Sequence, residues 1–316
     1  MERPFDVLAI GELNVDLILD QIQKFPEIGK EIIADKMNIA LGSSSAIFAS
    51  NLSTLGSKVS FVGQLGQDHF GDFVIECLEA QGVNTEYILR SSMHATGATV
   101  VLNYSEDRAM VTYPGAMKYL TMRNIPDVAF ASCKHLHISS IFLQPGIAVD
   151  LVPLFQKAKA SGLTTSIDPQ WDPSERWEIA FRELLPYVDV FMPNIKELNA
   201  MTQSNSLEDG LNALKAHGTV IVVKSGSDGA FLWDGQSLLH QKPFLNTKVA
   251  DSIGAGDSFN AGFLHKYLRK APLTECLEFG ALTGAINTTR SGGTAAFKSF
   301  DLVKEIAQSS FNYTLA

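Results

Sequence analysis

The chain has 316 residues, of which 46% are hydrophobic and 19% charged, a composition typical of a globular protein with a buried core. Its 34 acidic residues outnumber its 25 lysines and arginines, so the net charge of −9 makes nucleic acid and membrane surfaces poor partners. The three cysteines show no paired spacing, which argues against a disulfide framework or a thiolate zinc site. The start of the chain is unlike a signal peptide, and no apolar run approaches the roughly 18 residues of a membrane span, so we expect a cytoplasmic protein.

Short β-branched runs alternate with longer helical patterns along most of the chain. This alternation predicts an α/β fold with a mostly parallel sheet and helices on both faces. No linker or internal repeat divides the sequence, so we expect one domain over residues 1–316. Strands are predicted at 5–10, 59–62, 135–138, 164–167, 188–192 and 220–224, and helices at 46–55, 70–81, 147–160 and 207–216.

Four strand-like runs do not fit this alternation. Two of them, 98–103 and 109–113, flank the polar turn 104–108 and predict a β-hairpin. The other two, 13–20 and 31–39, do not lie between helices. The segments at about 12–40 and 95–115 are therefore expected to form a small antiparallel sheet that closes over the active site as a lid. Its exposed apolar strands are expected to pair two subunits into a homodimer.

The most informative segment is DSIGAGDSFNAGF at residues 251–263. Its glycines allow a tight turn before a helical pattern, so the N–H groups of Gly254, Ala255 and Gly256 would point outward from a helix N-terminus and bind an anion. Asp257 follows in the first helical turn. Because a carboxylate repels a bound phosphate, we infer that it accepts the proton of a hydroxyl attacking that phosphate. A lone G-x-G-D pattern would equally allow Asp257 to cap the helix.

Other phosphate-binding patterns are absent from the sequence. There is no G-x-x-x-x-G-K-[ST] run, and Phe259 stands where the third glycine of G-x-G-x-x-G belongs. No such fingerprint follows the first predicted strand either, which makes a dinucleotide-dependent dehydrogenase a distant alternative.

The chain resembles the PfkB, or ribokinase-like, family of carbohydrate kinases over essentially its whole length, and residues 251–263 match the family's C-terminal signature almost without change. The resemblance implies a three-layer α/β/α sandwich with a small β-sheet lid. It also implies transfer of the γ-phosphoryl group of ATP, with Mg²⁺, to a primary hydroxyl of a small sugar of the ribose or fructose class. By this resemblance Asp257 is the catalytic base and Gly254, Ala255 and Gly256 form the anion hole. Some relatives bind a monovalent cation such as K⁺ near residues 251–252.

Two early motifs carry the resemblance on the sugar side. GELNVD at 11–16 follows the first strand, where the family places an aspartate on substrate hydroxyls, here Asp16. A carboxylate can accept two adjacent hydroxyl protons, although a turn acid at a strand end would look the same. The family's early glycine pair appears as Gly42 and Ser43, which the resemblance assigns to substrate binding.

Further motifs support the resemblance to the PfkB family at the nucleotide site. PNIKEL at 193–198 resembles the family's N-x-x-E motif, in which Glu197 would hold magnesium through water and Asn194 would contact phosphate oxygens. Without the resemblance these residues could equally be a solvated helix start. KSGSDG at 224–229 resembles the nucleotide loop, with Ser225 and Gly226 as contacts and the role of Lys224 open, and Asn287 falls where the family wraps the adenine.

Three positions depart from the family pattern. Ile47 replaces an asparagine that often contacts sugar hydroxyls, and Gln170 and Asp172 alter a stretch usually written D-P-N-x-R. Loss of that arginine removes a charge that could bind an acidic or phosphorylated sugar, which favours a neutral sugar or polyol. His135 and His137 alternate on one strand, and without a third ligand we interpret them as structural.

Two other functions compete with a sugar kinase. A nucleoside kinase of the adenosine type would use the same scaffold. A non-catalytic sugar-sensing protein could have kept the fold, although such a protein needs neither Asp257 nor the glycine turn.

Overall fold

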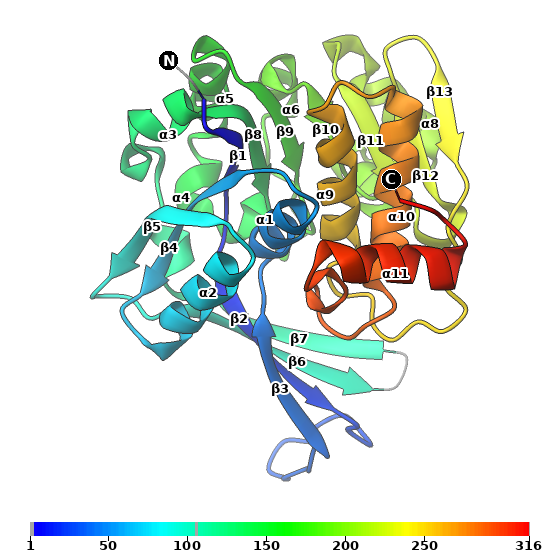
Figure 1. Cartoon of the computed structure of the whole chain (residues 1–316). Helices are drawn as coiled ribbons and strands as arrows, with labels where there is room; N and C mark the ends of the chain where they lie inside the picture. The colour runs from blue at the N-terminus through cyan, green and yellow to red at the C-terminus, as the bar shows by residue number, and fades with distance from the viewer. Residues whose placement is uncertain (1–2, 105–106, 316) are drawn as a thin grey trace.

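Two β-sheets of unequal size form the framework of the protein (Figure 1). The structure is a computed structural model that describes residues 3–104 and 107–315. The larger sheet has nine strands in the order β13-β12-β11-β10-β9-β8-β1-β4-β5 and is parallel from β11 to β5. Its last two strands, β12 and β13, pair antiparallel at one edge. The strands are β1 (Phe5–Ile10), β4 (Val59–Gly66), β5 (Asn84–Ser91), β8 (Cys133–Ser139), β9 (Thr164–Asp168), β10 (Val190–Phe191), β11 (Val220–Lys224), β12 (Ala230–Trp233) and β13 (Leu238–Gln241).

Alternate residues of the central strands pack into two hydrophobic cores, one on each face of the sheet. In β1, Val7 and Ala9 belong to one core and Leu8 and Ile10 to the other. Such continuous apolar runs are typical of parallel strands that are covered on both sides.

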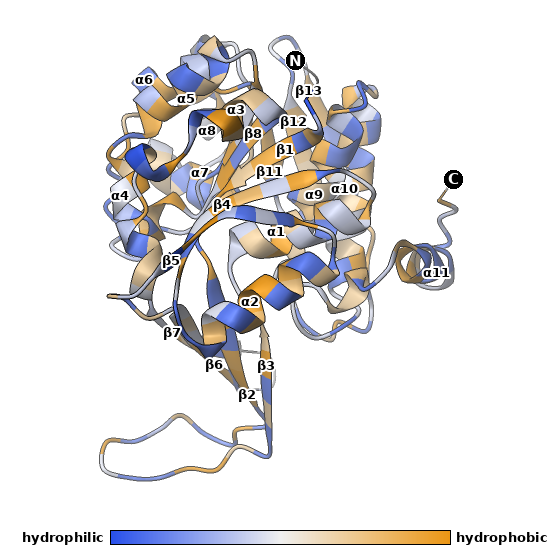
Figure 2. Cartoon of the chain, turned by 60° about the vertical axis from the view of Figure 1, so that its left-hand side comes forward, coloured by the Kyte–Doolittle hydropathy of each residue, from blue (hydrophilic) through white to orange (hydrophobic). Residues whose placement is uncertain are grey.

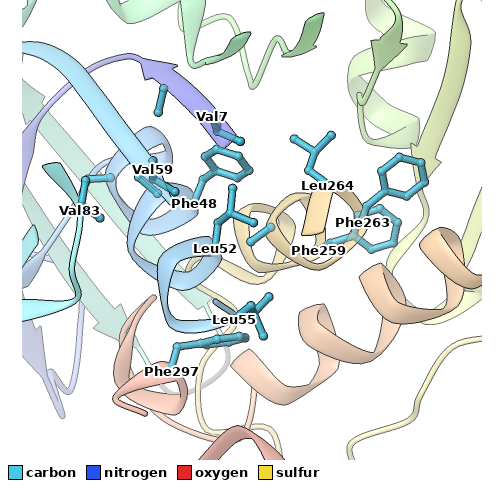
Figure 3. Close-up of a cluster of buried hydrophobic side chains, with 14 of the residues drawn as sticks. Val7, Phe48, Leu52, Leu55, Val59, Val83, Phe259, Phe263, Leu264 and Phe297 are labelled. Carbon is cyan, nitrogen blue, oxygen red and sulfur yellow. The ribbon is translucent and has the colours of Figure 1, made fainter. Parts of the chain in front are cut away.

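Helices cover both of these faces, so the predicted α/β/α sandwich is confirmed. Figure 3 shows the first core, where Phe48 and Leu52 of α1 face Phe259 and Leu264 of α9. That face carries α1 (Ser44–Thr54), α2 (His69–Ala80), α9 (Ala255–Tyr267), α10 (Leu273–Asn287) and α11 (Phe300–Phe311). The other carries α3 (Asp127–Ser132), α4 (Pro145–Ala148), α5 (Leu151–Ala160), α6 (Phe181–Leu184), α7 (Ile195–Thr202) and α8 (Leu207–Leu214).

The smaller sheet contains β2 (Asn14–Asp20), β3 (Lys36–Leu41), β6 (Gly97–Tyr104) and β7 (Asp107–Tyr113), in the order β3-β2-β6-β7. The predicted hairpin is the β6–β7 pair, and residues 105 and 106 of its turn lie outside the described residues. The expectation of a purely antiparallel sheet was wrong, because β2 and β6 pair in parallel. Both strands follow parallel strands of the large sheet, β1 and β5, so they leave it in the same direction.

The small sheet extends away from the carboxyl edge of the large sheet, and the chain between β2 and β3 reaches furthest from it (Figure 2). Its two edge strands expose large apolar side chains, among them Met37 of β3 and Val111 of β7. In the residues that the structure describes, no helix has the length and apolar character needed to cross a membrane.

Candidate active site

A cavity of about 590 Å³ opens at the carboxyl edge of the large sheet. Clefts at this edge are the usual ligand sites of parallel α/β sheets. The loop after β9, the start of α7, the end of β11 and the start of α9 all meet there. Of the residues predicted from the sequence, Asn194, Glu197, Gly226, Gly254, Ala255, Gly256 and Asp257 line the cavity.

The glycine turn forms the start of α9, as the sequence predicts. Gly254 is the N-cap residue with a φ of 74°, a conformation that favours glycine. Space also requires glycine there, because a Cβ atom would lie 2.7 Å from the Cα of Gly293. The N–H of Ala255 donates to the carbonyl of Ser252 at 3.3 Å. The prediction that the Ala255 N–H points at an anion therefore meets a competing acceptor, whereas the other first-turn amides have no acceptor within the helix and carry partial positive charge, so they can bind an anion.

Asp257 is the third residue of α9, and only 6% of it is exposed. Its Oδ1 atom accepts hydrogen bonds from the Ser44 hydroxyl and, at 3.0 Å, from the Gln170 amide. Burial, reinforced by the carboxylate of Asp168, raises the pKa of Asp257 to about 7. A carboxylate with this pKa can take a proton from an alcohol near neutral pH.

Asp168 joins three elements beneath the cavity. It ends β9 and is fully buried. Its Oδ2 atom accepts bonds from Lys224 of β11 at 2.5 Å, from Asn260 of α9 at 2.5 Å and from Gln170 at 3.1 Å. Asn260 lies three residues after Asp257 on α9, so Asp168 fixes the helix that carries the predicted base.

The N-x-x-E motif forms a reciprocal cap at the start of α7. The Asn194 side chain accepts from the N–H of Glu197 at 2.9 Å, and the Glu197 carboxylate accepts from the N–H of Asn194 at 2.8 Å. The Asn194 amide also donates to Glu197 Oε1 at 2.5 Å. Burial and the carboxylate of Asp168 raise the pKa of Glu197 to about 7. The two residues therefore lie together in the cavity, as their spacing predicts.

The donor set near Glu197 is compatible with magnesium. No group of three or more His, Cys, Asp or Glu side chains that could hold a metal occurs within residues 3–104 and 107–315. Mg²⁺ beside phosphates needs fewer protein ligands, because it keeps water and takes one or two carboxylates together with the phosphate oxygens. Glu197, with Asp168 as its charged neighbour, fits that requirement.

Asp16, Gly42 and Ser43 are not among the residues that line this cavity, and they lie together where the end of β3, which pairs with β2, leads into α1. Asp16 is buried and accepts from the Asn14 amide at 3.2 Å, and burial raises its pKa to about 6. A Cβ on Gly42 would collide with the Asp16 carboxylate, so only glycine fits there. Ser43 is the N-cap of α1 with a φ of 71°, and its hydroxyl bonds the Glu12 carbonyl at 2.5 Å.

Ser225 and Asn287 are not among the residues that line the cavity. Ser225 closes the turn after β11 through a 2.9 Å bond from its N–H to the carbonyl of Gly229. Asn287 is fully buried and donates to the carbonyl of Ile253 at 2.5 Å, so it supports the glycine turn from beneath. Other residues of α10, including Gly284, face the cavity.

The three departures from the family pattern have different surroundings. Ile47 is buried against the turn, with its Cγ2 atom 3.0 Å from where a Cβ of Gly254 would stand. Asp172 holds its own loop by accepting from the N–H groups of Ser174 at 2.8 Å and Trp177 at 2.7 Å. Gln170, with a φ of 60°, reaches Asp257 directly.

The two histidines of β8 have polar partners inside the sheet. His135 bonds Thr164 and Ser166, each at 2.7 Å, and His137 bonds Ser166 at 2.7 Å. Burial lowers the pKa of His135 to about 3 and keeps the ring neutral. These contacts support the structural interpretation.

Four residues of this site carry no role in the sequence prediction: Ser44, Asp168, Lys224 and Asn260. Asp168, Lys224 and Asn260 all lie in motifs that the sequence singled out, and Asn260 also stands one helical turn after Asp257. Ser44 directly follows the substituted glycine pair, which is the one feature that could have drawn attention to it.

Comparison with known proteins identifies the family of the chain. Residues 5–299 match the model of the pfkB family carbohydrate kinases. A deoxyribokinase of Salmonella typhimurium is 28% identical over 319 residues, 95% of this chain and 98% of that protein. A nucleoside kinase of Methanothermobacter thermautotrophicus is 25% identical over 283 residues, 89% and 88% of the two chains.

A solved structure shows the same fold. The ribokinase of Arabidopsis thaliana complexed with ribose and ATP superimposes with a TM-score of 0.81 at 22% identity, over 97% of this chain and 99% of that one. The family match over residues 5–299 identifies the class of enzyme, and the solved structure shows the same fold. The chain belongs to the pfkB family of carbohydrate kinases, phosphotransferases that use ATP and an alcohol acceptor.

Proposed function

We propose that the chain transfers the γ-phosphoryl group of ATP to a primary hydroxyl of a small neutral sugar or polyol of the ribose or fructose class. One observation carries the proposal: the buried carboxyl of Asp257, with a pKa raised to about 7, stands in the first turn of α9 beside Gly254 and Gly256. An acid that can be deprotonated near pH 7 and a helix N-terminus that binds anions are the two groups that phosphoryl transfer to an alcohol needs.

In this mechanism Asp257 accepts the proton of the sugar hydroxyl as its oxygen attacks the phosphorus. Ser44 and Gln170 orient the carboxylate by donating to Oδ1, so Oδ2 is the atom that takes the proton. The backbone N–H groups at the start of α9 stabilise charge on the transferred group. Because phosphoryl transfer passes through a loose transition state, positioning and electrostatic stabilisation contribute more than proton transfer.

Glu197, with Asn194 beside it, would hold Mg²⁺ through water, and the ion would neutralise charge on the phosphate oxygens. A monovalent cation near Asp251 stays a prediction. Asp251 accepts from the N–H groups of Ile253 at 2.9 Å and Gly292 at 3.0 Å, so it links the turn to the segment after α10.

Asp16 is proposed to bind sugar hydroxyls, with Gly42 and Ser43 shaping the same pocket. The absence of the family's arginine supports a neutral sugar, since Asp172 at that position accepts hydrogen bonds from Ser174, Arg176 and Trp177 of its own loop. A nucleoside is the second candidate acceptor, because the nucleoside kinase of M. thermautotrophicus aligns over most of the chain.

The whole chain is proposed to act as one kinase domain in which residues 12–40 and 95–115 form the lid. The exposed apolar side chains on β3 and β7 support pairing of two small sheets in a homodimer. Light scattering after size exclusion tests the dimer. We expect twice the chain mass for the native protein and monomers for Val111→Asp, whereas a monomeric native protein would contradict the dimer.

An acceptor screen tests the proposed function. Consumption of ATP is measured with Mg²⁺ against ribose, deoxyribose, fructose, sugar acids and adenosine, each also with Asp257→Asn. A matched control is Asp234→Asn, which changes an exposed turn aspartate on the β12–β13 loop. The proposal predicts phosphorylation of a neutral sugar that Asp257→Asn loses and Asp234→Asn retains. Preference for adenosine would establish the nucleoside kinase, and sugar binding without ATP consumption would establish the sensor.

A further inference from the structure

Lys224 is a buried cation inside the cavity that the mechanism above does not use. It ends β11, and its side chain is only 11% exposed. Its Nζ atom lies 3.6 Å from the position that a Cβ atom of Gly256 would take. The ammonium therefore lies beside the backbone of the glycine turn, with no side chain between them.

Lys224 keeps its charge in this environment. Burial lowers its pKa, but the carboxylates of Asp168 and Glu197 outweigh burial and hold the pKa above its ordinary value. An ammonium group has three N–H donors. Asp168 takes one at 2.5 Å, and Asn260 Oδ1 lies within reach of a second at 3.4 Å. One donor remains for an oxygen atom in the cavity.

The charge balance of the cavity indicates what that donor is for. Asp168, Glu197 and Asp257 bring three buried carboxyl groups to the place where ATP phosphates must bind. A helix N-terminus supplies only about half an elementary charge against them. The cations that line the cavity in the described part of the chain are Lys224 and Arg108, and Arg108 bonds Ser252 on the side of the lid. Lys224 is thus the cation next to the glycine turn.

We propose that Lys224 is a catalytic residue whose ammonium donates a hydrogen bond to the γ-phosphoryl group during its transfer. Asp168 is then a positioning residue that holds the ammonium against the turn. The bond from the γ-phosphorus to the bridging oxygen of ADP breaks, and a bond to the sugar oxygen forms. The hydroxyl proton goes to Asp257, while Lys224 stays protonated throughout. This inference rests on the proposed function for its role in the reaction, but its contact with the terminal phosphate can be tested without turnover.

The alternative is that Lys224 only neutralises Asp168 inside the fold. Lys224→Met alone would leave Asp168 as an uncompensated buried charge and could unfold the chain. The double variant Asp168→Asn with Lys224→Met removes both partners of the ion pair and leaves the net charge of the cavity unchanged. Lys159→Met is the matched control, because Lys159 forms an ion pair with Asp189 at 2.8 Å. Asp189 directly precedes β10, so this pair lies at the amino edge of the large sheet, opposite the cavity.

The experiment measures binding of ADP and of a non-hydrolysable ATP analogue to each variant with Mg²⁺, the thermal midpoint, and kcat for the acceptor found in the screen. We expect Lys224→Met and the double variant to lose roughly 100-fold in kcat, the loss typical of one removed transition-state donor. Both should bind ADP nearly normally but the ATP analogue about tenfold more weakly, since only the analogue carries the terminal phosphate. Lys159→Met should change the thermal midpoint and leave both the ADP-to-analogue ratio and kcat unchanged.

Two results would overturn the inference. One is recovery of kcat in the double variant, which would show that Lys224 serves only to balance Asp168. The other is equal weakening of ADP and of the ATP analogue, which would place Lys224 away from the terminal phosphate. If the native protein phosphorylates no acceptor, the proposed function fails, and the binding ratio still decides whether Lys224 contacts the γ-phosphate.

Discussion

The side-chain amide of Gln170 donates a 3.0 Å hydrogen bond to Oδ1 of Asp257, which links the end of β9 to the first turn of α9. The Ser44 hydroxyl donates to the same oxygen atom. Both donors favour the charged carboxylate, whereas burial opposes it. The pKa of the proposed base is therefore set by a balance that mutation can shift.

The pH dependence of turnover should reveal this balance. Because Asp257 must be deprotonated to act, kcat/KM should be constant above about pH 7, the pKa of its carboxyl, and fall about tenfold per unit below it. Ser44→Ala removes a hydrogen-bond donor to the ionised carboxylate, so it should raise the pKa of Asp257 and move the pH at which kcat/KM begins to fall to a higher value. Rates between pH 5.5 and 8.5 check both statements. A flat profile across that range would exclude Asp257 as the base.

Asp257→Asn should lower kcat by about 10²–10⁴-fold, the usual contribution of a general base, while sugar binding is retained. Steady-state rates and calorimetric titration with the sugar separate the two effects. Near-normal turnover in this variant would show that the proton leaves by another route.

The same variant should be more stable than the native protein at high pH. The folded-state pKa of Asp257, about 7, exceeds its ordinary value of 3.8, so ionisation of the buried group destabilises the fold as pH rises from about 4 to 7. Asp257→Asn should therefore gain up to about 4 kcal/mol at pH 8, the full shift of about three pKa units, and less than half of that at pH 5.

Urea unfolding of both proteins measures this gain, and a gain that does not depend on pH would contradict the prediction. The difference between the two proteins is the useful quantity, because buried histidines titrate in the opposite sense. Burial lowers the pKa of His135 to about 3 and of His265 to about 4. The contribution of these histidines to the free energy of unfolding rises with pH, so in the native protein it partly masks the destabilisation by Asp257. The histidines are the same in both proteins, so their contribution cancels in the difference.

Ser43 should show opposing effects of backbone strain and helix capping. Its φ of 71° is a strained conformation for a residue with a side chain, and its hydroxyl accepts from the N–H of Ala46 at 3.0 Å. Ser43→Ala keeps the strain and loses the cap, so it should cost about 1–2 kcal/mol. Ser43→Gly loses the cap but relieves the strain and should stay close to the native stability. A glycine variant less stable than the alanine variant would contradict this explanation.

Arg108 should act as a latch between the lid and the glycine turn. It lies on β7, and its guanidinium donates to the Ser252 hydroxyl at 2.9 Å. Arg108→Ala should raise ATP hydrolysis without sugar relative to sugar phosphorylation, because an open lid admits water as the acceptor. Arg123→Ala, at an exposed position after the lid, is the control. An unchanged ratio of the two activities in Arg108→Ala would contradict the latch.

The parts of the site that are local in sequence could be predicted from it. The glycine turn needs Gly254 for both conformation and space, and the cap between Asn194 and Glu197 needs only their three-residue spacing. In contrast, the contacts of Asp257 with Ser44 and Gln170 join segments 213 and 87 residues apart. No local pattern encodes such contacts, because they depend on how β9, α1 and α9 pack.

The same limit applies to the fold. The alternation of Val7, Leu8, Ala9 and Ile10 between two cores matches the strand pattern that was predicted. Helix α10 was missed, because it buries residues all around its axis and shows no amphipathic period. The parallel pairing of β2 with β6 arises because both strands leave the same edge of the large sheet. The sequences of the two strands carry no information about that edge.

The most direct test of the account is a crystal structure of the chain with Mg²⁺ and a non-hydrolysable ATP analogue. The account predicts that a γ-phosphate oxygen lies about 3 Å from the backbone N–H groups at the start of α9, within hydrogen-bond distance. It also predicts that the Asp257 carboxyl lies on the far side of the phosphorus from ADP, in line for the attacking hydroxyl. A γ-phosphate bound away from residues 254–257 would contradict the assignment of the glycine turn and of the base together.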